Sequence, residues 1–554
     1  NIQAVTSTAT TYDAMIDSPT NATSGTQPVG NYAVMNPLDK STNVTLTNAN
    51  FTVTTAVTNA GVRSTMYIPS TGKYYWEGTC TTKTNYPIIG IANATWDKTY
   101  VGSATGSYGY GTDGFKYPSN TSYAASYTSG DIIGVAYDAD AGTLTFYKNN
   151  TSQGTAYTGL TDIYAPAVSG QASDVWNMNF GQRPFTYTPP SGYQSLCTTN
   201  LPDSTIVQGN KHMDAVLWTG DGTSSKTVSS YNFAPDFLWG KNRSDTSIGW
   251  WLYDTTRGAG ANKELGTHQN YAEGGDNEDT YGYLSAFTSN GFTGVNGSGS
   301  PNYYFNKSSS TYVAYGLKAN GGTTSSNTSG SITSTVQANT TAGFSIVTYT
   351  GNGSSGATFG HGLGVAPKFV IINNRNVGGT DWNCYHTSLG NTGGIYLNRT
   401  DAYTASTSFF NNTTPSATLV TLGSGSGVNA STRTYVAYCF AEIAGFSKFG
   451  SYTGNGSNDG PFVYLGFRPK FVMIKKSSST GSWSILDSAR DTYNQGYKSL
   501  YSDLTNAENT IYDYRDFLSN GFKIRYTDQN QNESGQTFIY MAFAENPFKN
   551  SLAR

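Results

Sequence analysis

The stretch that decides the fold of this chain covers residues 452–545, near its C-terminal end. It contains, in order, YTGNG (452–456), FRPKFVMIK (467–475), WSILD (483–487), FLSNGF (517–522) and TFIYMAFAE (537–545). These patterns recur in the same order further upstream, so the stretch is one copy of an internal repeat.

Two further copies of the repeat precede this stretch. The second copy has YTGNG (349–353), APKFVII (366–372), WNCYH (382–386) and TYVAYCFAE (434–442). The first copy has WTGDG (218–222), APDFLWGK (234–241), WWLYD (250–254), FTSNGF (287–292) and TYVAY (311–315), with long insertions between them. This ordered recurrence predicts three related modules.

The patterns within each module are typical of β-strands. A proline directly before Phe-Val-x-Ile suits the first residue of a strand, where no ladder donor is needed. Ser-Asn-Gly-Phe is a turn in which glycine accepts a positive φ. The alternation in TYVAYCFA suits a core strand buried on at least one face. We therefore expect an all-β chain that ends in three β-sandwich-type modules in series.

The modules resemble a poorly characterised domain that is common in virion proteins of tailed bacteriophages, especially tail fibres. The most specific stretches are HGLGVAPKF (361–369), FAE (440–442) with FSKFGSY (446–452), and FAENPFK (543–549). The first module departs from the pattern, because GLK (316–318) stands where the others have FAE. The resemblance implies a tail fibre or a related appendage at the surface of a virion.

The region before the modules also has dense strand signals. KYYWEGT (73–79) and PIIGIA (87–92) alternate between two faces, and IIGVAYD (132–138) and LTFYKN (144–149) flank a glycine-containing hairpin loop. Together with GYG (109–111), GDIIGV (130–135) and YAPAV (164–168), these stretches resemble a SPRY domain. The resemblance implies a bent two-sheet, concanavalin-like β-sandwich that binds partners through loops at one edge and has no catalytic apparatus.

We expect five regions along the chain. Residues 1–50 are predicted to be a leader or docking strands, with short strands in 12–21 and 30–38, and 51–190 to be the SPRY-like sandwich. The three modules cover 204–320, 342–446 and 447–554. The segments 190–203 and 321–341 are rich in small and polar residues and are predicted to be linkers. The chain begins at Asn1, so we expect that an upstream piece was cleaved or left out.

Composition excludes several classes of function. Charged residues make up 12% of the chain, about half of the roughly 25% that is usual, and the net charge is −3. Nucleic-acid binding would need a basic face, and no apolar run is long enough to span a membrane. The four cysteines (Cys80, Cys197, Cys384 and Cys439) are too far apart for a disulfide framework, so buried free thiols are expected.

No catalytic constellation is apparent. The four histidines (His212, His268, His361 and His386) show no metal-ligand spacing, and packing roles are favoured for them. A glycosidase would need two carboxylates across a cleft; Asp254, Asp487 and Glu545 are available, but their repeated positions favour turns and strand ends. An acidic run offers a weak calcium site at Asp276, Glu278 and Asp279, although a solvated loop is the favoured interpretation. No cofactor is predicted.

Exposed aromatic rings are the best candidates for binding, because tyrosine and tryptophan stack on sugars and give large contact areas. The candidates are Trp96, Tyr108, Tyr110, Tyr117 and Tyr123 in the SPRY-like region, and Trp250 and Trp251 in the first module. Core or inter-subunit packing is the alternative for all of them. For Trp76, Trp382 and Trp483 it is the expected role.

These observations predict a non-enzymatic virion appendage that attaches to a host-surface receptor, with a glycan as the favoured receptor. The expected partners are further copies of the chain in a homotrimer, other virion proteins through the N-terminal region, and the receptor. A three-fold assembly would hide exposed strand edges. The alternatives are a purely structural subunit of an appendage, filament or head decoration, and a polysaccharide depolymerase.

Overall fold

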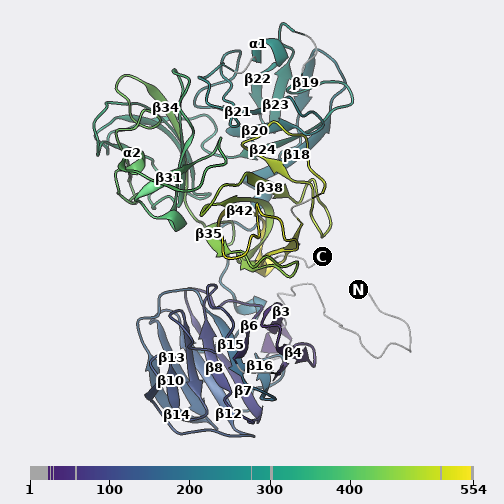
Figure 1. The fold of residues 1–554 in the computed structure, drawn as a ribbon, viewed down its shortest axis with the longest axis vertical. Helices are drawn as coiled ribbons and strands as arrows, with labels where there is room; N and C mark the ends of the chain where they lie inside the picture. Colours follow the sequence, from purple (N-terminus) through teal and green to yellow (C-terminus); the bar gives the residue numbers. More distant parts are fainter. Residues whose placement is uncertain are drawn as a thin grey trace. The chain divides into compact units, whose positions relative to one another are not determined.

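A computed structural model describes residues 23–24, 27–28, 30–56, 59–275, 278–299, 303–511 and 514–550. The described chain divides into two compact units, with the boundary between residues 203 and 204 (Figure 1). Unit 1 contains the SPRY-like region and unit 2 contains the three modules, and each is treated by itself. The expected strand at 12–21 lies outside the described residues.

Unit 1 is a two-sheet β-sandwich, as expected. One sheet has the order β11-β10-β9-β8-β15-β6-β3, and the other has the order β14-β13-β12-β7-β16-β5-β4, with β17 beside β7. The strands of the first sheet are β3 Met35–Lys40, β6 Ala60–Ser64, β8 Ile88–Ala92, β9 Ser107–Gly111, β10 Phe115–Tyr117, β11 Thr121–Ser122 and β15 Ala165–Gly170. Those of the second are β4 Val44–Thr47, β5 Thr52–Thr55, β7 Lys73–Thr82, β12 Ile132–Asp138, β13 Thr143–Lys148, β14 Thr151–Tyr157, β16 Val175–Asn179 and β17 Gln194–Ser195. The short hairpin β1 (Thr23–Ser24) and β2 (Gln27–Pro28) precedes them.

The sandwich is held by aromatic rings between its sheets and by one buried ion pair. Trp76 on β7 and Trp176 on β16 have no exposed surface. Arg63 on β6 donates from Nε and Nη2 to the carboxylate of Asp39 on β3, at 2.7 and 2.8 Å. Since β3 and β4 lie before residue 51 and still pair inside these two sheets, the sandwich begins upstream of that position.

The three modules of unit 2 repeat one strand order. The order is β18-β24-β20-β21 in module 1, β27-β34-β29-β30 in module 2 and β35-β42-β37-β38 in module 3. In each module the first strand of this order ends in the threonine of the Thr-Gly motif, and it pairs with the strand that closes the module. The closing strand also pairs with the strand that contains the Phe of the Pro-x-Phe motif. That strand in turn pairs with the tryptophan strand, which contains or directly follows the repeated tryptophan. The repeat seen in the sequence is therefore also a structural repeat.

The elements of unit 2 have the following bounds. Module 1, after η2 (Gly209–Lys211), has β18 Met213–Thr219, β19 Ser225–Val228, β20 Phe237–Asn242, β21 Trp250–Asp254, α1 Glu278–Tyr281, β22 Tyr283–Thr288, β23 Gly291–Val295 and β24 Thr311–Leu317. Module 2 has β25 Ser325–Asn327, β26 Ser334–Asn339, β27 Phe344–Thr350, β28 Thr358–Gly360, β29 Phe369–Asn374, β30 Asn383–His386, η3 Thr387–Leu389, β31 Gly393–Tyr396, β32 Thr404–Ala405, α2 Thr407–Phe410, β33 Leu419–Thr421 and β34 Thr434–Phe440. Module 3 has β35 Ser447–Thr453, β36 Phe462–Tyr464, β37 Phe467–Lys476, β38 Trp483–Asp487, β39 Leu500–Tyr501, β40 Arg515–Leu518, β41 Gly521–Ile524, β42 Thr537–Pro547 and η4 Phe548–Asn550.

The segment 321–341 is not the linker that its composition predicted. Its strands β25 and β26 extend the sheet of module 2, and β26 pairs with β27 over its whole length. Val336 and Gln337 on β26 are buried. Similarly, part of the other predicted linker, 190–203, is ordered on unit 1 through β17 and η1 (Thr198–Asn200).

The three modules form a closed ring around one shared core. Each module places the ring of its repeated tryptophan in a single continuous hydrophobic cluster. Trp250 Nε1 of module 1 donates to the carbonyl of Tyr501 in module 3 (2.7 Å), and Trp483 Nε1 of module 3 donates to Tyr396 in module 2 (2.9 Å). Trp382 Nε1 of module 2 closes the ring on Gly266 in module 1 (3.1 Å). Unit 2 is thus an approximately three-fold assembly within one chain, its modules coloured teal, green and yellow in Figure 1.

Candidate functional site

The two tryptophans proposed as binding residues in module 1 are core residues. Trp250 and Trp251 have no exposed surface. They alternate along β21: the Trp250 ring joins the core shared by the modules, and the Trp251 ring joins the core of module 1. Gly240 on the neighbouring strand leaves room for Trp251, because a Cβ there would lie 2.0 Å from the indole. The prediction that Trp250 and Trp251 are exposed is wrong, because β21 is covered on both faces.

Two of the candidates in unit 1 are also buried. Trp96 is 4% exposed, and its Nε1 donates to the carbonyl of Tyr100 (3.1 Å) and to the hydroxyl of Ser103 (3.2 Å). Tyr110 has no exposed surface and contacts the rings of Tyr123 and Tyr127. Both rings therefore pack in the interior under the loops. The prediction that they are exposed is wrong.

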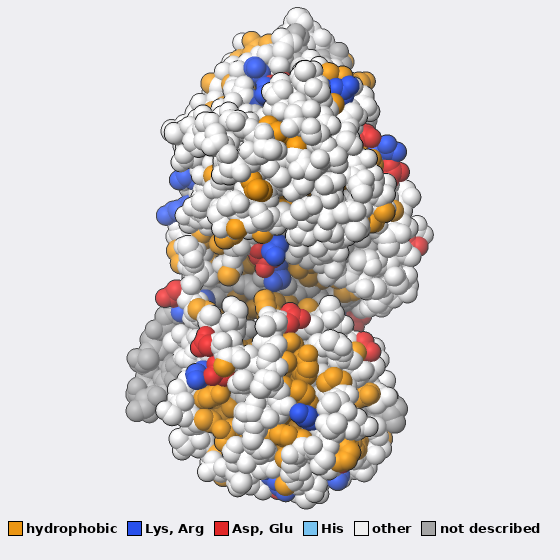
Figure 2. Space-filling model, turned by 90° about the vertical axis from the view of Figure 1, so that its left-hand side faces the viewer, with side chains coloured by type: hydrophobic (Ala, Val, Ile, Leu, Met, Phe, Trp, Pro, Cys, Tyr) orange, Lys and Arg blue, Asp and Glu red, His pale blue; other side chains and the backbone are white. Residues whose placement is uncertain are grey.

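The other three candidates lie in a half-buried group of tyrosines along β9, β10 and the adjoining segments. We call this group the tyrosine surface; its members are Tyr86, Tyr100, Tyr108, Tyr117, Tyr123 and Tyr157. Figure 2 shows hydrophobic side chains, a class that includes tyrosine, gathered on the face of unit 1 where Figure 1 labels β10, β13 and β14. The arrangement offers flat rings with polar tips, as partner-binding surfaces do.

A hydrogen-bonded chain organises one end of the tyrosine surface. The hydroxyls of Tyr86 and Tyr117 bond each other, and the Tyr117 hydroxyl lies 2.8 Å from the carboxylate of Asp113. The Tyr117 ring also meets the rings of Tyr86 and Tyr100 edge to face, at 6.0 and 6.3 Å between centroids. At the other end, Tyr157 meets Tyr108 at 5.1 Å. These contacts fix the rings before any partner arrives.

Burial raises the pKa of two phenols of the tyrosine surface. Loss of solvent raises the pKa of Tyr117 to about 12, and the pKa of Tyr123 also rises to about 12 for the same reason. A protonated phenol both donates and accepts a hydrogen bond. The tyrosine surface can therefore bind neutral polar groups as well as apolar ones.

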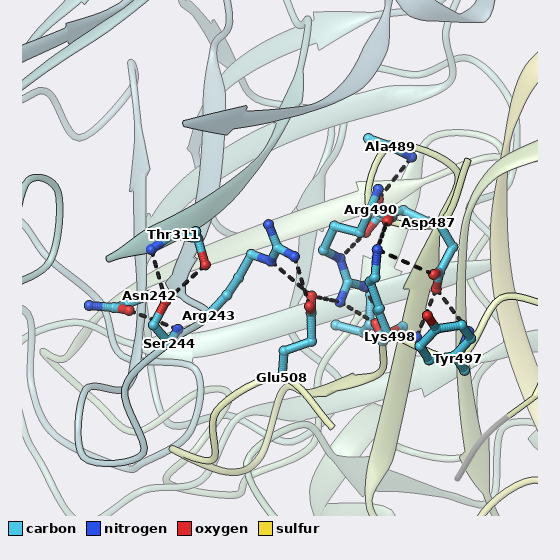
Figure 3. Close-up of polar contacts among 12 residues, drawn as sticks. Asn242, Arg243, Ser244, Thr311, Asp487, Ala489, Arg490, Tyr497, Lys498 and Glu508 are labelled. Carbon is cyan, nitrogen blue, oxygen red and sulfur yellow. Dashed lines mark hydrogen bonds and ion pairs between the residues drawn. The ribbon is translucent and has the colours of Figure 1, made fainter. Parts of the chain in front are cut away.

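Charged residues at the module interfaces are engaged in buried networks. In module 3, Arg490 donates to Asp487 at 2.5 Å, and its guanidinium reaches Glu508 at 3.0 Å (Figure 3). Glu508 also accepts two hydrogen bonds from Arg243 of module 1, at 2.8 and 2.7 Å. Tyr315 of module 1 donates to Asp487 at 2.8 Å. Figure 3 shows Glu508 between Arg243 of module 1 and Arg490 of module 3.

The interface between modules 1 and 2 repeats this network. Arg257 pairs with Asp254 at 2.6 Å, and Arg375 of module 2 pairs with Glu273 at 2.6 Å. Tyr438 of module 2 donates to Asp254 at 2.7 Å. The repeated aspartates thus serve a structural role. Burial alone would raise the pKa of Asp487, but the Arg490 guanidinium outweighs burial and lowers it.

The third interface, between modules 3 and 2, lacks these charges. His386 stands where the other modules have aspartate, and its Nε2 lies 3.1 Å from the carbonyl of Tyr540. His386 is 1% exposed, and burial lowers its pKa to about 4. His361 is buried as well and lies 3.2 Å from the carbonyl of Ser416. Both histidines have packing roles.

The described residues offer no metal centre. No group of three or more His, Cys, Asp or Glu side chains within them could hold an ion. Of the weak calcium candidates, Asp276 lies outside the described residues, and only the backbone of Glu278 and Asp279, in α1, is described. Cys80, Cys197, Cys384 and Cys439 are buried free thiols, as predicted. Among the described residues, no helix is long and apolar enough to cross a membrane.

Unit 2 contains two surface cavities with polar linings. One, of about 430 Å³ in module 3, is lined by residues of the segment 491–498 with Thr510 and Tyr514, and it includes the 82% exposed ring of Tyr493. The other, of about 300 Å³ in module 2, is lined by residues 379–381, 383, 396, 404, 406, 408, 409 and 425–427. Each is lined by a single carboxylate, Asp491 in the first and Asp381 in the second. Sequence reasoning missed both, because their walls come from separate loops.

Curated proteins similar to this chain match it over a minor part of its length. An E3 ubiquitin-protein ligase RKP from Arabidopsis thaliana is 31% identical over 136 residues, which are 22% of this chain and 10% of that protein. Ran-binding protein 9 from Xenopus tropicalis is 32% identical over 27% of this chain and 30% of that protein. Ran-binding protein 10 from Danio rerio is 33% identical over 23% of both chains. The chain thus spans less than a third of the length of each of these relatives.

Solved structures similar to this chain are SPRY domains. The SPRY domain of human HERC1 has 18% sequence identity and a TM-score of 0.25, covering 27% of this chain and 99% of that one. The PSpry domain of TRIM65 has 15% identity and a TM-score of 0.24, covering 27% of this chain and 93% of that one.

Two families account for the two units. Residues 73–183 match the SPRY domain, in agreement with the two-sheet sandwich of unit 1. Residues 208–547 match a family described as a domain of unknown function, DUF7483, and this match spans all three modules in one stretch. The chain belongs to the DUF7483 family and carries a SPRY domain ahead of the DUF7483 region.

Proposed function

We propose that the protein is a non-enzymatic recognition protein of a virion appendage, in which the SPRY domain binds a host-surface receptor. The observation that carries the proposal is the tyrosine surface, a set of half-buried rings whose hydroxyls and ring contacts are fixed in advance. Preorganised aromatic rings bind at low entropic cost. Three of the residues selected from the sequence, Tyr108, Tyr117 and Tyr123, belong to this surface.

The proposed place of action, the surface of a tailed bacteriophage particle, rests on the resemblance of the modules to phage virion proteins. The composition supports it, since a neutral polar surface with 12% charged residues suits an extracellular structure. The proposed partners are the receptor, with a glycan favoured, and other virion proteins. Several weak contacts made by many copies on one particle would hold it through avidity.

A competition assay tests the proposal. The purified chain should block adsorption of the particles that carry it to their host cells. Replacing two rings of the tyrosine surface, Tyr117→Ala with Tyr123→Ala, should weaken the competition at least tenfold. Tyr493→Ala is the matched control, because this tyrosine is 82% exposed in unit 2 and should leave competition unchanged.

Two outcomes would contradict the proposal. Either the unmodified chain fails to compete, or the double variant competes as well as the unmodified chain. A labelled antibody against the chain gives an independent check by electron microscopy: labelling of the appendage is expected, and labelling of the head would exclude attachment.

A second candidate function, a purely structural subunit of an appendage, is favoured by the interior of unit 2. Its three modules share one core, and the ion pairs Arg243–Glu508 and Arg375–Glu273 join module 1 to modules 3 and 2, which suits a structural part. In that case the tyrosine surface would be covered by a neighbouring subunit, and the competition assay would show no effect of the chain.

The depolymerase alternative receives no such support. A glycosidase acts through two carboxyl groups on either side of the bond that it breaks. The cavities in modules 2 and 3 described above are each lined by one carboxylate. Asp254 and Asp487 are buried against arginines and have no exposed surface.

A further inference from the structure

The cavity in module 2, lined by residues 379–381, 383, 396, 404, 406, 408, 409 and 425–427, has the features of a ligand site. We call it the module 2 cavity. Its volume of about 300 Å³ lies at the lower end of the roughly 300–1,000 Å³ of small-molecule sites, so it suits a ligand of about one sugar ring. It lies in unit 2 and is therefore separate from the tyrosine surface of the SPRY domain.

The walls of the module 2 cavity are held in place by both neighbouring modules. The Tyr396 carbonyl accepts a hydrogen bond from Trp483 Nε1 of module 3 at 2.9 Å. The Gly379 amide donates to the carbonyl of Asn270 in module 1 at 2.7 Å. Within module 2, the Gly425 amide donates to the carbonyl of Ser408 at 3.1 Å. A ligand would thus meet a preformed site and would not have to order its walls.

The lining is polar and rich in hydroxyl and amide groups. Thr404, Ser406 and Ser408 line one wall and Asn383 lines another. The Asn383 amide nitrogen also donates to the carbonyl of Asp381 at 2.6 Å, and the Ser406 hydroxyl accepts from the Ser408 amide at 3.2 Å. The Asn383 side chain can lie against the third wall because Gly427 has no Cβ, which would otherwise sit 2.1 Å from the amide nitrogen. These groups both donate and accept hydrogen bonds.

The charges around the cavity exclude ionic ligands. Its one carboxylate, Asp381, accepts a hydrogen bond from Arg399 at 2.9 Å and another from Asn398 at 2.8 Å. The guanidinium of Arg399 is also paired with Asp401, so it is not available to an anion. A divalent cation would need several oxygen ligands of which at least some are carboxylates, and only one is present.

Two aromatic rings complete the lining. The Tyr396 and Phe409 rings lie 5.3 Å apart between centroids, and Tyr396 remains partly exposed. Sugars present both hydroxyls and an apolar ring face, so hydroxyls, an amide and a partly exposed aromatic ring suit them. We propose that the module 2 cavity is a binding site for a neutral saccharide unit. This site goes beyond the proposed function, since it requires nothing of the SPRY domain.

The test uses the full chain and five simple sugars: glucose, galactose, mannose, rhamnose and N-acetylglucosamine. Saturation-transfer NMR followed by titration should show binding of at least one of them, with a Kd of about 1 mM, typical of a weak single-ring site. Ser408→Phe, which fills the cavity from an exposed position, should weaken this binding at least tenfold. Thr407→Phe is the matched control, because Thr407 is exposed on the same turn and does not line the cavity.

A second variant, Thr404→Phe, fills the cavity from another exposed position in the lining. It controls for a local folding defect in Ser408→Phe. The proposal is overturned if none of the five sugars binds, or if both filling variants bind as well as the unmodified chain. The Tyr117→Ala, Tyr123→Ala variant separates the two proposals: it should retain sugar binding here even though it loses competition for host cells.

Discussion

A single replacement makes one of the three module interfaces chemically different from the others. Asp254 and Asp487 occupy equivalent positions and are held by arginines three residues later, whereas module 2 has His386 at that position. His386 is buried, neutral, and bonded to the backbone of module 3. The ring of modules therefore contains two interfaces with a buried aspartate–arginine pair and one in which a buried histidine takes the place of the aspartate.

The buried histidine makes stability depend on pH. The pKa of His386 is about 4 in the folded chain, below its ordinary 6.5, so the unfolded chain takes up the proton first as pH falls. The stabilisation is complete above pH 6.5 and is lost between pH 6.5 and about 4. At pH 5 the loss relative to pH 7 is about 2 kcal/mol. Urea unfolding at both pH values should show a smaller loss for His386→Gln, and an unchanged pH dependence would contradict this assignment.

The buried aspartates are expected to be essential for folding stability. Asp487→Asn removes the nearer of the two carboxylates that pair with the buried Arg490 and leaves Glu508 at 3.0 Å, so the expected loss is about 2–3 kcal/mol, below the roughly 3–5 kcal/mol of a fully unpaired buried charge. Denaturant unfolding measures the effect. Asp221→Asn is the control, since its pair with Lys226 is exposed to solvent and should leave the midpoint unchanged. Equal effects of the two changes would refute a buried role for Asp487.

Residue chemistry alone could not separate core rings from surface rings. Trp76, Trp382 and Trp483 were predicted to be core, and all three are buried. Trp250 occupies the same repeat position as Trp382 and Trp483, so the repeat contained the signal that it belongs to the core. Trp251 gave no such signal, because its position in the other modules is held by Asn383 and Ser484.

At the scale of elements, the tryptophan strands β21, β30 and β38 form the joints of the ring. Trp250 on β21, Trp483 on β38 and Trp382, which directly precedes β30, each place an indole in the shared core and donate its N–H to the backbone of a neighbouring module. The strands themselves were readable from their alternation, and β7, β8, β12 and β13 lie where the patterns placed them. β25 and β26 were missed, because small polar residues on an edge strand look like a flexible segment.

The contribution of the Trp250 indole hydrogen bond, between modules 1 and 3, to the free energy of unfolding should be measurable. Trp250→Phe keeps an aromatic ring but removes the indole donor from the carbonyl of Tyr501, which keeps the longer bond from the Leu504 amide at 3.3 Å, so the expected cost is about 1 kcal/mol. Trp218→Phe is the matched control, since Trp218 donates within module 1 from a partly exposed position, where water can replace it. Urea unfolding followed by circular dichroism compares the two, and equal destabilisation would count against the interface role.

For the whole molecule, three-fold packing is present within one chain. The homotrimer predicted from the sequence rested on the need to hide strand edges, and the closed ring of modules meets part of that need internally. We therefore expect a monomer in dilute solution, with a mass near 59.2 kDa by sedimentation equilibrium. A mass three times larger would support the homotrimer instead.

The sequence predicted the number and order of the modules but not their packing into a ring. The repeated patterns specify the strands of one module. Such strands are compatible with three independently folded modules as well as with modules that share one core. The difference lies in which face of each sheet meets a neighbour, and alternation along a strand that is buried on both faces does not reveal it. The module 2 cavity was missed for the same reason, since two of its walls are fixed by other modules.

Hydrogen exchange of the full chain measures whether the three modules of unit 2 unfold as one cooperative structure. Asp487 contacts modules 1 and 3, so Asp487→Asn should reduce amide protection in β24 and β42 and, by the same free energy, in β34 of module 2. Loss of protection in β24 and β42 with β34 unchanged would show that the modules open independently, and would contradict the shared core.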